Sequence, residues 1–93
     1  MLTLEYQAQF KRDMRTILRR GWDIAPLQEI VEMLQMGAEL PERCRDHPLH
    51  GGWADYRDCH IKGDWVLIYR ISKEQGTLRL VRTGTHADLG LGH

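Results

Sequence analysis

Residues 56–83 read YRDCHIKGDWVLIYRISKEQGTLRLVRT, and this stretch decides the fold. It contains three strand-like runs rich in β-branched and aromatic residues, namely Tyr56–Ile61, Trp65–Ile71 and Thr77–Thr83. The turn residues Lys62–Gly63–Asp64 and Glu74–Gln75–Gly76 separate the three runs. Connections as short as these force neighbouring strands to run antiparallel. The middle run is apolar at nearly every position from its start, which predicts a central strand covered on both faces.

The segment before this stretch predicts a short strand and two helices. Leu2 and Leu4 could begin the strand, and apolar residues then recur at helical spacing until Gly21. The residues of this first apolar stripe are Phe10, Met14, Ile17 and Leu18. A second helix is predicted from Asp23, a suitable N-cap, to Gly37, with Pro26 tolerated in its first turn. Its buried stripe consists of Leu27, Ile30, Val31 and Leu34.

These elements predict one α+β domain that spans residues 1–93. Two N-terminal helices should pack on one face of a small, mainly antiparallel, four-stranded sheet. A chain of 93 residues has room for one modest core and no second domain.

The charge balance and the cysteine content exclude some classes of function for this chain. Thirteen basic and thirteen acidic residues cancel, which excludes a uniformly basic nucleic-acid-binding protein. Any RNA contact must come from a local patch, and Arg12, Arg15 and Arg19 form a stripe of this kind on the first helix. Two cysteines, no secretory leader and no membrane-spanning apolar run predict a cytoplasmic protein that does not act at a membrane.

The distribution of the histidines suggests a catalytic site, because all five follow residue 46. They are His47, His50, His60, His86 and His93. In the predicted antiparallel sheet His60, Asp64, Arg82 and His86 converge on one rim, and the loop that carries His47 leads into it. Imidazoles can exchange protons near neutral pH, a carboxylate can assist them, and a guanidinium matches a phosphate. The pattern favours acid–base cleavage of a phosphate ester, as in a small nuclease.

Two alternatives accompany this hypothesis. Each histidine taken singly could be an ordinary surface residue. Cys44-x-x-His47-x-x-His50, followed by Cys59 and His60, also offers zinc ligands at short spacing. The chain has no Cys-x-x-Cys pair, and Cys59 and His60 point to opposite faces of one strand. We therefore predict no metal site and no cofactor.

Three segments together resemble the YafQ branch of the RelE toxin superfamily. They are Asp46–His60 (DHPLHGGWADYRDCH), Asp64–Tyr69 (DWVLIY) and Arg82–Ala87 (RTGTHA). The resemblance implies a compact, RelE-like fold of the microbial-ribonuclease type. It also implies a toxin of a type II toxin–antitoxin system, a ribosome-dependent endoribonuclease that cuts mRNA without metal. The implied partners are the ribosome with its mRNA and a cognate antitoxin, and DNA is reached only through that antitoxin.

Carried over by motif position, the catalytic residues are His47, His60, Asp64, Arg82 and His86. The resemblance favours His86 as general acid, Arg82 on the phosphate, and Asp64, His47 or His60 as base. Trp65 adjoins this set as an RNA-binding candidate. Arg57 is a further RNA-binding candidate, with pairing to Asp55 or Asp58 as its alternative.

The chain departs from the family at its end, where Gly90 follows Leu89 in place of the usual aromatic residue. That aromatic is expected to help position a base. The departure leaves open a second hypothesis: a catalytically weak or inactive toxin-like module that binds a DNA-binding antitoxin.

Overall fold

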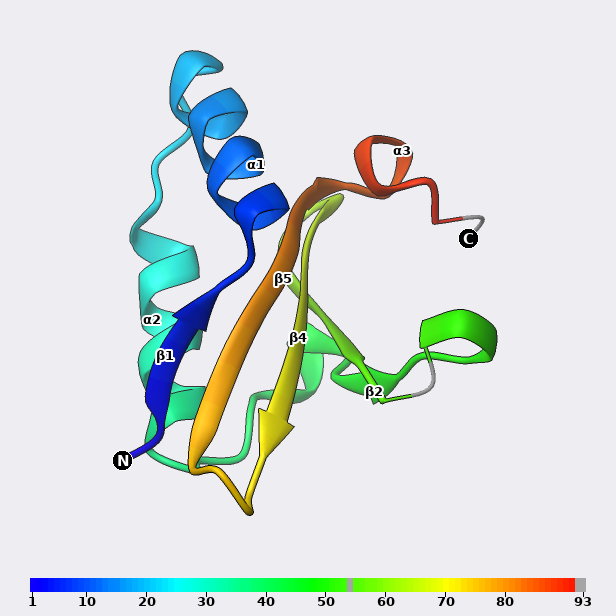
Figure 1. The fold of residues 1–93 in the computed structure, drawn as a ribbon. Coiled ribbons are helices and arrows are strands. Elements are labelled where there is room, and N and C mark those ends of the chain that lie inside the picture. Colours follow the sequence, from blue (N-terminus) through cyan, green and yellow to red (C-terminus); the bar gives the residue numbers. More distant parts are fainter. Residues whose placement is uncertain (54, 92–93) are drawn as a thin grey trace.

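The computed structural model describes residues 1–53 and 55–91. Its elements follow in the order β1 (Thr3–Tyr6), α1 (Ala8–Arg19), α2 (Ala25–Gln35), β2 (His47–Pro48), β3 (Arg57–Lys62), β4 (Trp65–Ser72), β5 (Thr77–Thr85) and α3 (His86–Leu89) (Figure 1). Short 3₁₀ turns at Glu42–Cys44 and Gly51–Trp53 flank β2. The predicted α+β class, with two N-terminal helices on a mainly antiparallel sheet, is confirmed.

The sheet has five strands in the order β1-β5-β4-β3-β2, one more than predicted. The additional strand is β2, where His47 pairs with Asp58 and Pro48 with Arg57 inside a segment whose composition predicts only a loop. Proline cannot donate a backbone hydrogen bond, and an edge strand tolerates it. Strand β1 pairs in parallel with β5, and every other pair is antiparallel.

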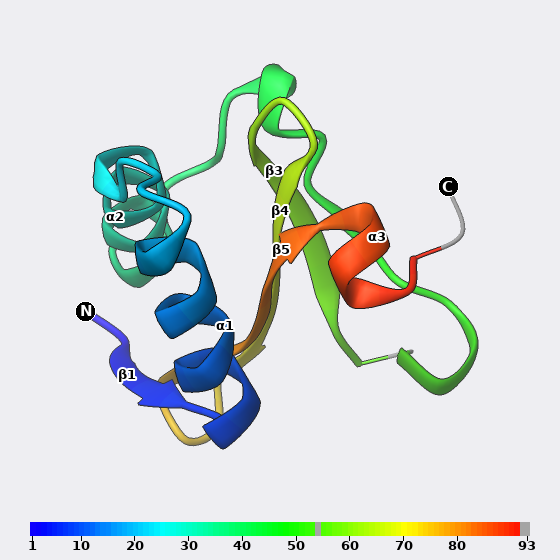
Figure 2. The same cartoon turned by 90° about the horizontal axis from the view of Figure 1, so that it is seen from above.

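Strand β4 is the central, doubly covered strand that its apolar run predicts. Its first five side chains, from Trp65 to Tyr69, are all buried. Helices α1 and α2 cover one face of the sheet, whereas α3 and the segment that follows β2 lie beside the other (Figure 2). Two apolar clusters result.

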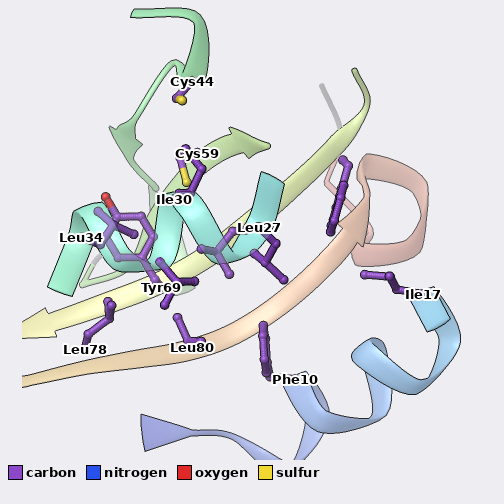
Figure 3. Close-up of a cluster of buried hydrophobic side chains, with 13 residues drawn as sticks. Phe10, Ile17, Leu27, Ile30, Leu34, Cys44, Cys59, Tyr69, Leu78 and Leu80 are labelled. Atoms are coloured by element: carbon purple, nitrogen blue, oxygen red, sulfur yellow. The ribbon is translucent and has the colours of Figure 1, made fainter. Parts of the chain in front are cut away.

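On the helical face, side chains from α1 and α2 pack against β4 and β5, as Figure 3 shows for Phe10, Leu27, Tyr69 and Leu80. On the opposite face, a smaller cluster contains Leu49, Val66, Ile68, Val81 and Leu89. This second cluster holds α3 against the sheet, and α3 carries His86.

The helices differ from their predicted bounds at the ends. Helix α1 stops at Arg19, and Gly21 adopts a left-handed φ of 78° just beyond it. The N-cap of α2 is Ile24, while Asp23 accepts a hydrogen bond on Oδ1 from the Ala25 amide at 3.0 Å. The prediction that Leu18 is buried was wrong, because its side chain is 57% exposed. Leu18 follows Ile17 by one residue and is turned away from the buried stripe.

Within the described residues, no helix combines the length and apolarity needed to cross a membrane.

Tyr69 carries a polar anchor into the main core, and its loss should lower stability. The ring is buried, and its hydroxyl donates to Asp46 Oδ1 at 2.5 Å. Burial is the largest cause, and the Asp46 hydrogen bond the second, of a raised Tyr69 pKa. Tyr69→Phe removes a hydrogen bond to a charged group and should lower the free energy of unfolding by about 1.5–3 kcal/mol. Urea denaturation measures this, and Tyr6→Phe on an exposed ring is the matched control. Equal stability of the two variants would contradict the prediction.

Candidate active site

Asp64 and His86 form the centre of the candidate site. His86 Nδ1 donates a hydrogen bond to Asp64 Oδ1 across 22 residues of sequence. The His86 side chain is 14% exposed and that of Asp64 is 61% exposed. The hydrogen bond from His86 is the largest cause of a lowered Asp64 pKa, so the carboxylate is ionised at neutral pH. Asp64 therefore fixes which nitrogen of His86 carries the proton.

His60 lies beside this pair because of the strand register. On β4, Val66 is opposite His60 of β3 and also opposite Gly84 of β5. Helix α3 begins two residues after Gly84, with His86 as its first residue. His86 therefore lies near the cross-strand positions of His60, Val66 and Gly84. The imidazole centroids of His60 and His86 are 5.1 Å apart. Of the four residues predicted to converge, His60, Asp64, Arg82 and His86, these contacts join His60, Asp64 and His86.

His47 lies on the edge strand β2, opposite Asp58, which was not among the predicted site residues. His47 Nδ1 donates to the Arg45 carbonyl at 2.7 Å, in a turn where Arg45 has a left-handed φ of 47°. Asp58, which is fully buried, is opposite His47 and two residues before His60. Opposite residues, and residues two apart on a strand, project from the same face. The alternation of Asp58 and His60 was the signal that could have placed Asp58 here.

Arg82 is engaged by a carboxylate that the sequence analysis missed. Its Nε donates to Asp13 Oδ2 at 2.8 Å and its Nη2 to Asp13 Oδ1 at 3.3 Å. Asp13 Oδ2 also accepts the Thr83 amide at 3.1 Å, so α1 is tied to the edge of β5. Asp13 is a buried acid within the apolar stripe of α1, a position that calls for a partner. Arg82, predicted as the phosphate ligand, is thus held by a carboxylate of α1.

A second tie joins α1 to α3, and we call it the Arg20–Asp88 clasp. Two Arg20 nitrogens donate to the two Asp88 oxygens at 2.7 and 2.9 Å. Asp88 also accepts the Thr85 amide at 2.9 Å, while its own amide donates to Thr85 Oγ1 at 3.0 Å, forming a capping box. Hydrogen bonding by Arg20 is the main cause of a strongly lowered Asp88 pKa. The clasp fixes the start of α3, where His86 is the first residue.

Two RNA-binding candidates are placed differently from expectation. Trp65 is 5% exposed and donates its indole N–H to Thr83 Oγ1 at 2.8 Å, so its ring is mainly a core element. Arg57 forms an ion pair with Asp46, to which its Nε donates at 3.1 Å. That ion pair lies at the start of β3, three residues before His60.

The remaining candidates are on the surface. Arg12, Arg15 and Arg19 are exposed and line a shallow depression on the outer face of α1. His50 is exposed as well, and His93 lies outside the described residues.

The zinc alternative is not supported by the positions of its proposed ligands. Cys44 and Cys59 are buried among the apolar side chains on the helical face of the sheet (Figure 3), whereas His50 is exposed. In residues 1–53 and 55–91, no group of three or more histidine, cysteine or acidic side chains is arranged to hold a metal ion.

The Asp64–His86 hydrogen bond leads to a prediction about the Asp64 pKa that does not depend on catalysis. In His86→Ala the Asp64 pKa should rise toward its ordinary value of 3.8, because the donor that lowers it is gone. A lowered folded-state pKa stabilises the fold at and above the ordinary value, and this contribution is lost as pH falls through the folded pKa. The stabilisation that comes from the lowered Asp64 pKa should therefore be lost as pH falls through the folded-state pKa of Asp64, and His86→Ala should lack this loss in acid. Carboxyl ¹³C NMR titration measures the Asp64 pKa in the unaltered protein and in His86→Ala, with the Asp88 carboxyl as internal control. An Asp64 pKa that is the same in both proteins would contradict the pairing.

Comparisons with known proteins identify the family to which the chain belongs. The family model for the bacterial toxin of type II toxin-antitoxin system, YafQ, matches residues 2–91. The chain is 39% identical over 87 residues to the mRNA interferase toxin YafQ of Escherichia coli strain K12, covering 92% of each.

Solved structures are similar throughout their length. A metal-bound toxin from Helicobacter pylori has 40% identity and a TM-score of 0.90, covering 96% of this chain and 99% of that one. A chain of the Escherichia coli DinJ–YafQ toxin–antitoxin complex has 38% identity and a TM-score of 0.85, covering 95% and 96%. The chain described here therefore belongs to the YafQ family of bacterial toxins of type II toxin–antitoxin systems.

Proposed function

We propose that this toxin is an mRNA interferase, an endoribonuclease that cuts messenger RNA on the ribosome by acid–base catalysis without metal. The observation that carries the proposal is the Asp64–His86 hydrogen bond with the His60 ring 5.1 Å from that of His86. The name of the Escherichia coli relative, mRNA interferase toxin, supports the same substrate.

Cleavage of RNA can use its own 2′-hydroxyl as the nucleophile. A base takes the 2′-hydroxyl proton, the oxygen attacks the adjacent phosphorus, and an acid protonates the departing 5′-oxygen. The products are a 2′,3′-cyclic phosphate, or the 3′-phosphate formed from it, and a 5′-hydroxyl. Two correctly placed imidazoles supply both proton transfers.

His86 is assigned as the general acid and His60 as the base. Asp64 accepts from His86 Nδ1, so proton delivery to the leaving oxygen would occur from Nε2. This pairing gives Asp64 the role of a positioning group, which argues against its use as the base. The ring of His60 lies 5.1 Å from that of His86, which favours His60 as the base. For His47, on the edge strand, we propose a supporting role. Because the groups are close, the apparent pKa values of the reaction will belong to the cluster.

Positive charge for the RNA backbone comes from two places. Arg82 remains 24% exposed while Asp13 holds it, and it is assigned to the scissile phosphate. Arg12, Arg15 and Arg19 are assigned to flanking phosphates. Phosphate contacts of this kind release counterions, so binding should weaken as salt rises.

The partners follow from the same assignment. The DinJ–YafQ complex supports a cognate antitoxin that binds and neutralises this toxin, and through which any contact with DNA would be made. Ribosomes and mRNA would place its action in the cytoplasm.

A second candidate function is a catalytically weak module that serves mainly to bind the antitoxin. Gly90 favours it, since the residue after Leu89 is a helix-ending glycine with φ of 67° and offers no aromatic ring. This candidate predicts antitoxin binding without growth arrest.

In vitro cleavage separates the two candidates. Purified toxin should cut mRNA on programmed ribosomes, leave the same mRNA intact without ribosomes, and keep its rate after exhaustive chelation. Asp64→Asn should cut at least about ten-fold more slowly, because His86 loses its ionised acceptor. Rates equal to a no-enzyme control would favour the inactive module, and a rate abolished by chelation would reject metal independence.

A further inference from the structure

A cavity adjoins the candidate site at the edge of the sheet. It measures about 340 Å³ and is lined by Trp22 and Asp23 of the α1–α2 loop, Lys62 and Asp64 of the β3–β4 turn, Trp65 and Thr85. Asp64 therefore belongs both to the cavity wall and to the pair with His86. Thr85, the residue directly before His86, also lines it, so the cavity adjoins the candidate site through Asp64 and Thr85. We call it the indole pocket.

Two packed indole rings form its apolar wall. The ring centroids of Trp22 and Trp65 are 5.2 Å apart, with their planes inclined at 57°. Trp65 is fixed by its hydrogen bond to Thr83, whose hydroxyl in turn donates to the Val66 carbonyl at 2.8 Å. Arg20 lies over the Trp22 ring, with its Cζ 5.2 Å from the centroid. The wall is thus held by neighbours and does not depend on a ligand to form.

The rim of the pocket carries charged side chains, one of which is held in place by a hydrogen bond. Lys62 and Asp23 are exposed side chains on opposite segments of the lining. The hydrogen bond from the Ala25 amide to Asp23 Oδ1 holds that carboxylate at the start of α2. An apolar wall with one cation and two carboxylates at its rim suits a flat, partly polar ring attached to a phosphate.

We propose that the indole pocket binds one nucleobase of the messenger, adjacent to the phosphate at which the chain is cut. The inference rests on the proposed function and adds a specificity determinant to it. An aromatic base would bury its ring against the indole wall, and Lys62 would contact a neighbouring phosphate. A base bound in the indole pocket would adjoin the candidate active site, because it would lie against Asp64.

The carboxylates indicate which bases fit. Adenine, cytosine and guanine each carry an exocyclic amino group that can donate to a carboxylate, whereas uracil has no amino group and presents two carbonyl oxygens on either side of its N3–H. Asp23 is the acceptor assigned to that amino group, since Asp64 already accepts from His86. A uracil carbonyl facing Asp23 would meet a negative charge. The pocket should therefore favour amino-bearing bases over uracil on the order of ten-fold.

Single-base substitution in the message tests the proposal. Ribosomes are programmed with messages that differ only at the base beside the cut, and cleavage rates are compared for adenine, cytosine, guanine and uracil. Asp23→Asn should raise the relative rate on uracil, because an amide can also donate to a carbonyl. Lys62→Gln should slow all four messages to a similar degree. Glu29→Gln, an exposed acid-to-amide change on α2, is the matched control and should leave the profile unchanged.

The outcomes separate this inference from the function on which it rests. If the toxin cuts and the base profile of Asp23→Asn equals that of the unaltered protein, the pocket assignment is wrong while the nuclease stands. If the toxin cuts no message, both fail. Trp22→Phe and Trp22→Leu give a second measurement: the phenyl ring should retain the profile and leucine should flatten it. Equal profiles in these two folded variants would also overturn the proposal.

Discussion

Replacing His86 with alanine is expected to slow mRNA cleavage by at least about a hundred-fold and to abolish growth arrest on induction. The variant loses the assigned proton donor to the 5′-oxygen together with the residue that Asp64 positions. The fold should persist, because His86 is the first residue of a four-residue helix that Leu89 and the Arg20–Asp88 clasp continue to hold. Cleavage of programmed ribosomes, measured alongside the thermal midpoint of unfolding, checks both expectations.

His50→Ala is the matched control, since it removes an exposed imidazole from the same chain and should keep the original rate. Asp64→Asn added to His86→Ala should cause no further loss, because Asp64 is proposed to act through His86. Growth arrest by a folded His86→Ala variant equal to that of the unaltered toxin would reject the mechanism. A further large loss in the double variant would instead give Asp64 a chemical role of its own.

The sheet was predictable where local patterns determine it. The apolar run from Trp65 to Tyr69 identified the buried central strand, and the short turns at Gly63 and Gly76 required antiparallel neighbours. Strand β2 was not predictable in the same way. It has two residues, one of them a proline, and it exists because β3 offers an edge to pair with. Only tertiary context supplies such a strand.

The same division applies to the candidate site. His60, Asp64 and His86 were expected together because antiparallel register converts their sequence positions into neighbours. Asp13 was not expected, since 69 residues separate it from Arg82 and no local pattern relates them. Trp65 was assigned to RNA binding through its place in a motif, but its position in the central strand leaves it only 5% exposed, where it lines the indole pocket. The residue types could indicate the kind of chemistry. They could not indicate which side chains of α1, such as Asp13, hold the site residues in place.

Gly84→Ala is expected to reduce cleavage by about a hundred-fold without touching a reacting group, through displacement of His86. Gly84 has φ of 153°, and a Cβ built on it would lie 2.9 Å from Asp88 Oδ2 and 3.1 Å from Asp88 Cβ. Asp88 cannot yield easily, because Arg20 and the Thr85 amide hold its two oxygens. Alanine should therefore break the capping box and move the start of α3, which carries the imidazole.

The control for backbone strain is Gly76→Ala, which also substitutes a positive-φ glycine, here 66°, but meets no atom within 4 Å. It should lose stability and keep its cleavage rate when assayed well below its unfolding midpoint. Asp88→Ala should approach the activity of Gly84→Ala, since both release the clasp, and combining the two changes should add little. If Gly84→Ala cuts at the original rate, the placement of His86 does not depend on the clasp. Arg20→Lys then provides a graded test, because one ammonium cannot reproduce the paired hydrogen bonds of a guanidinium.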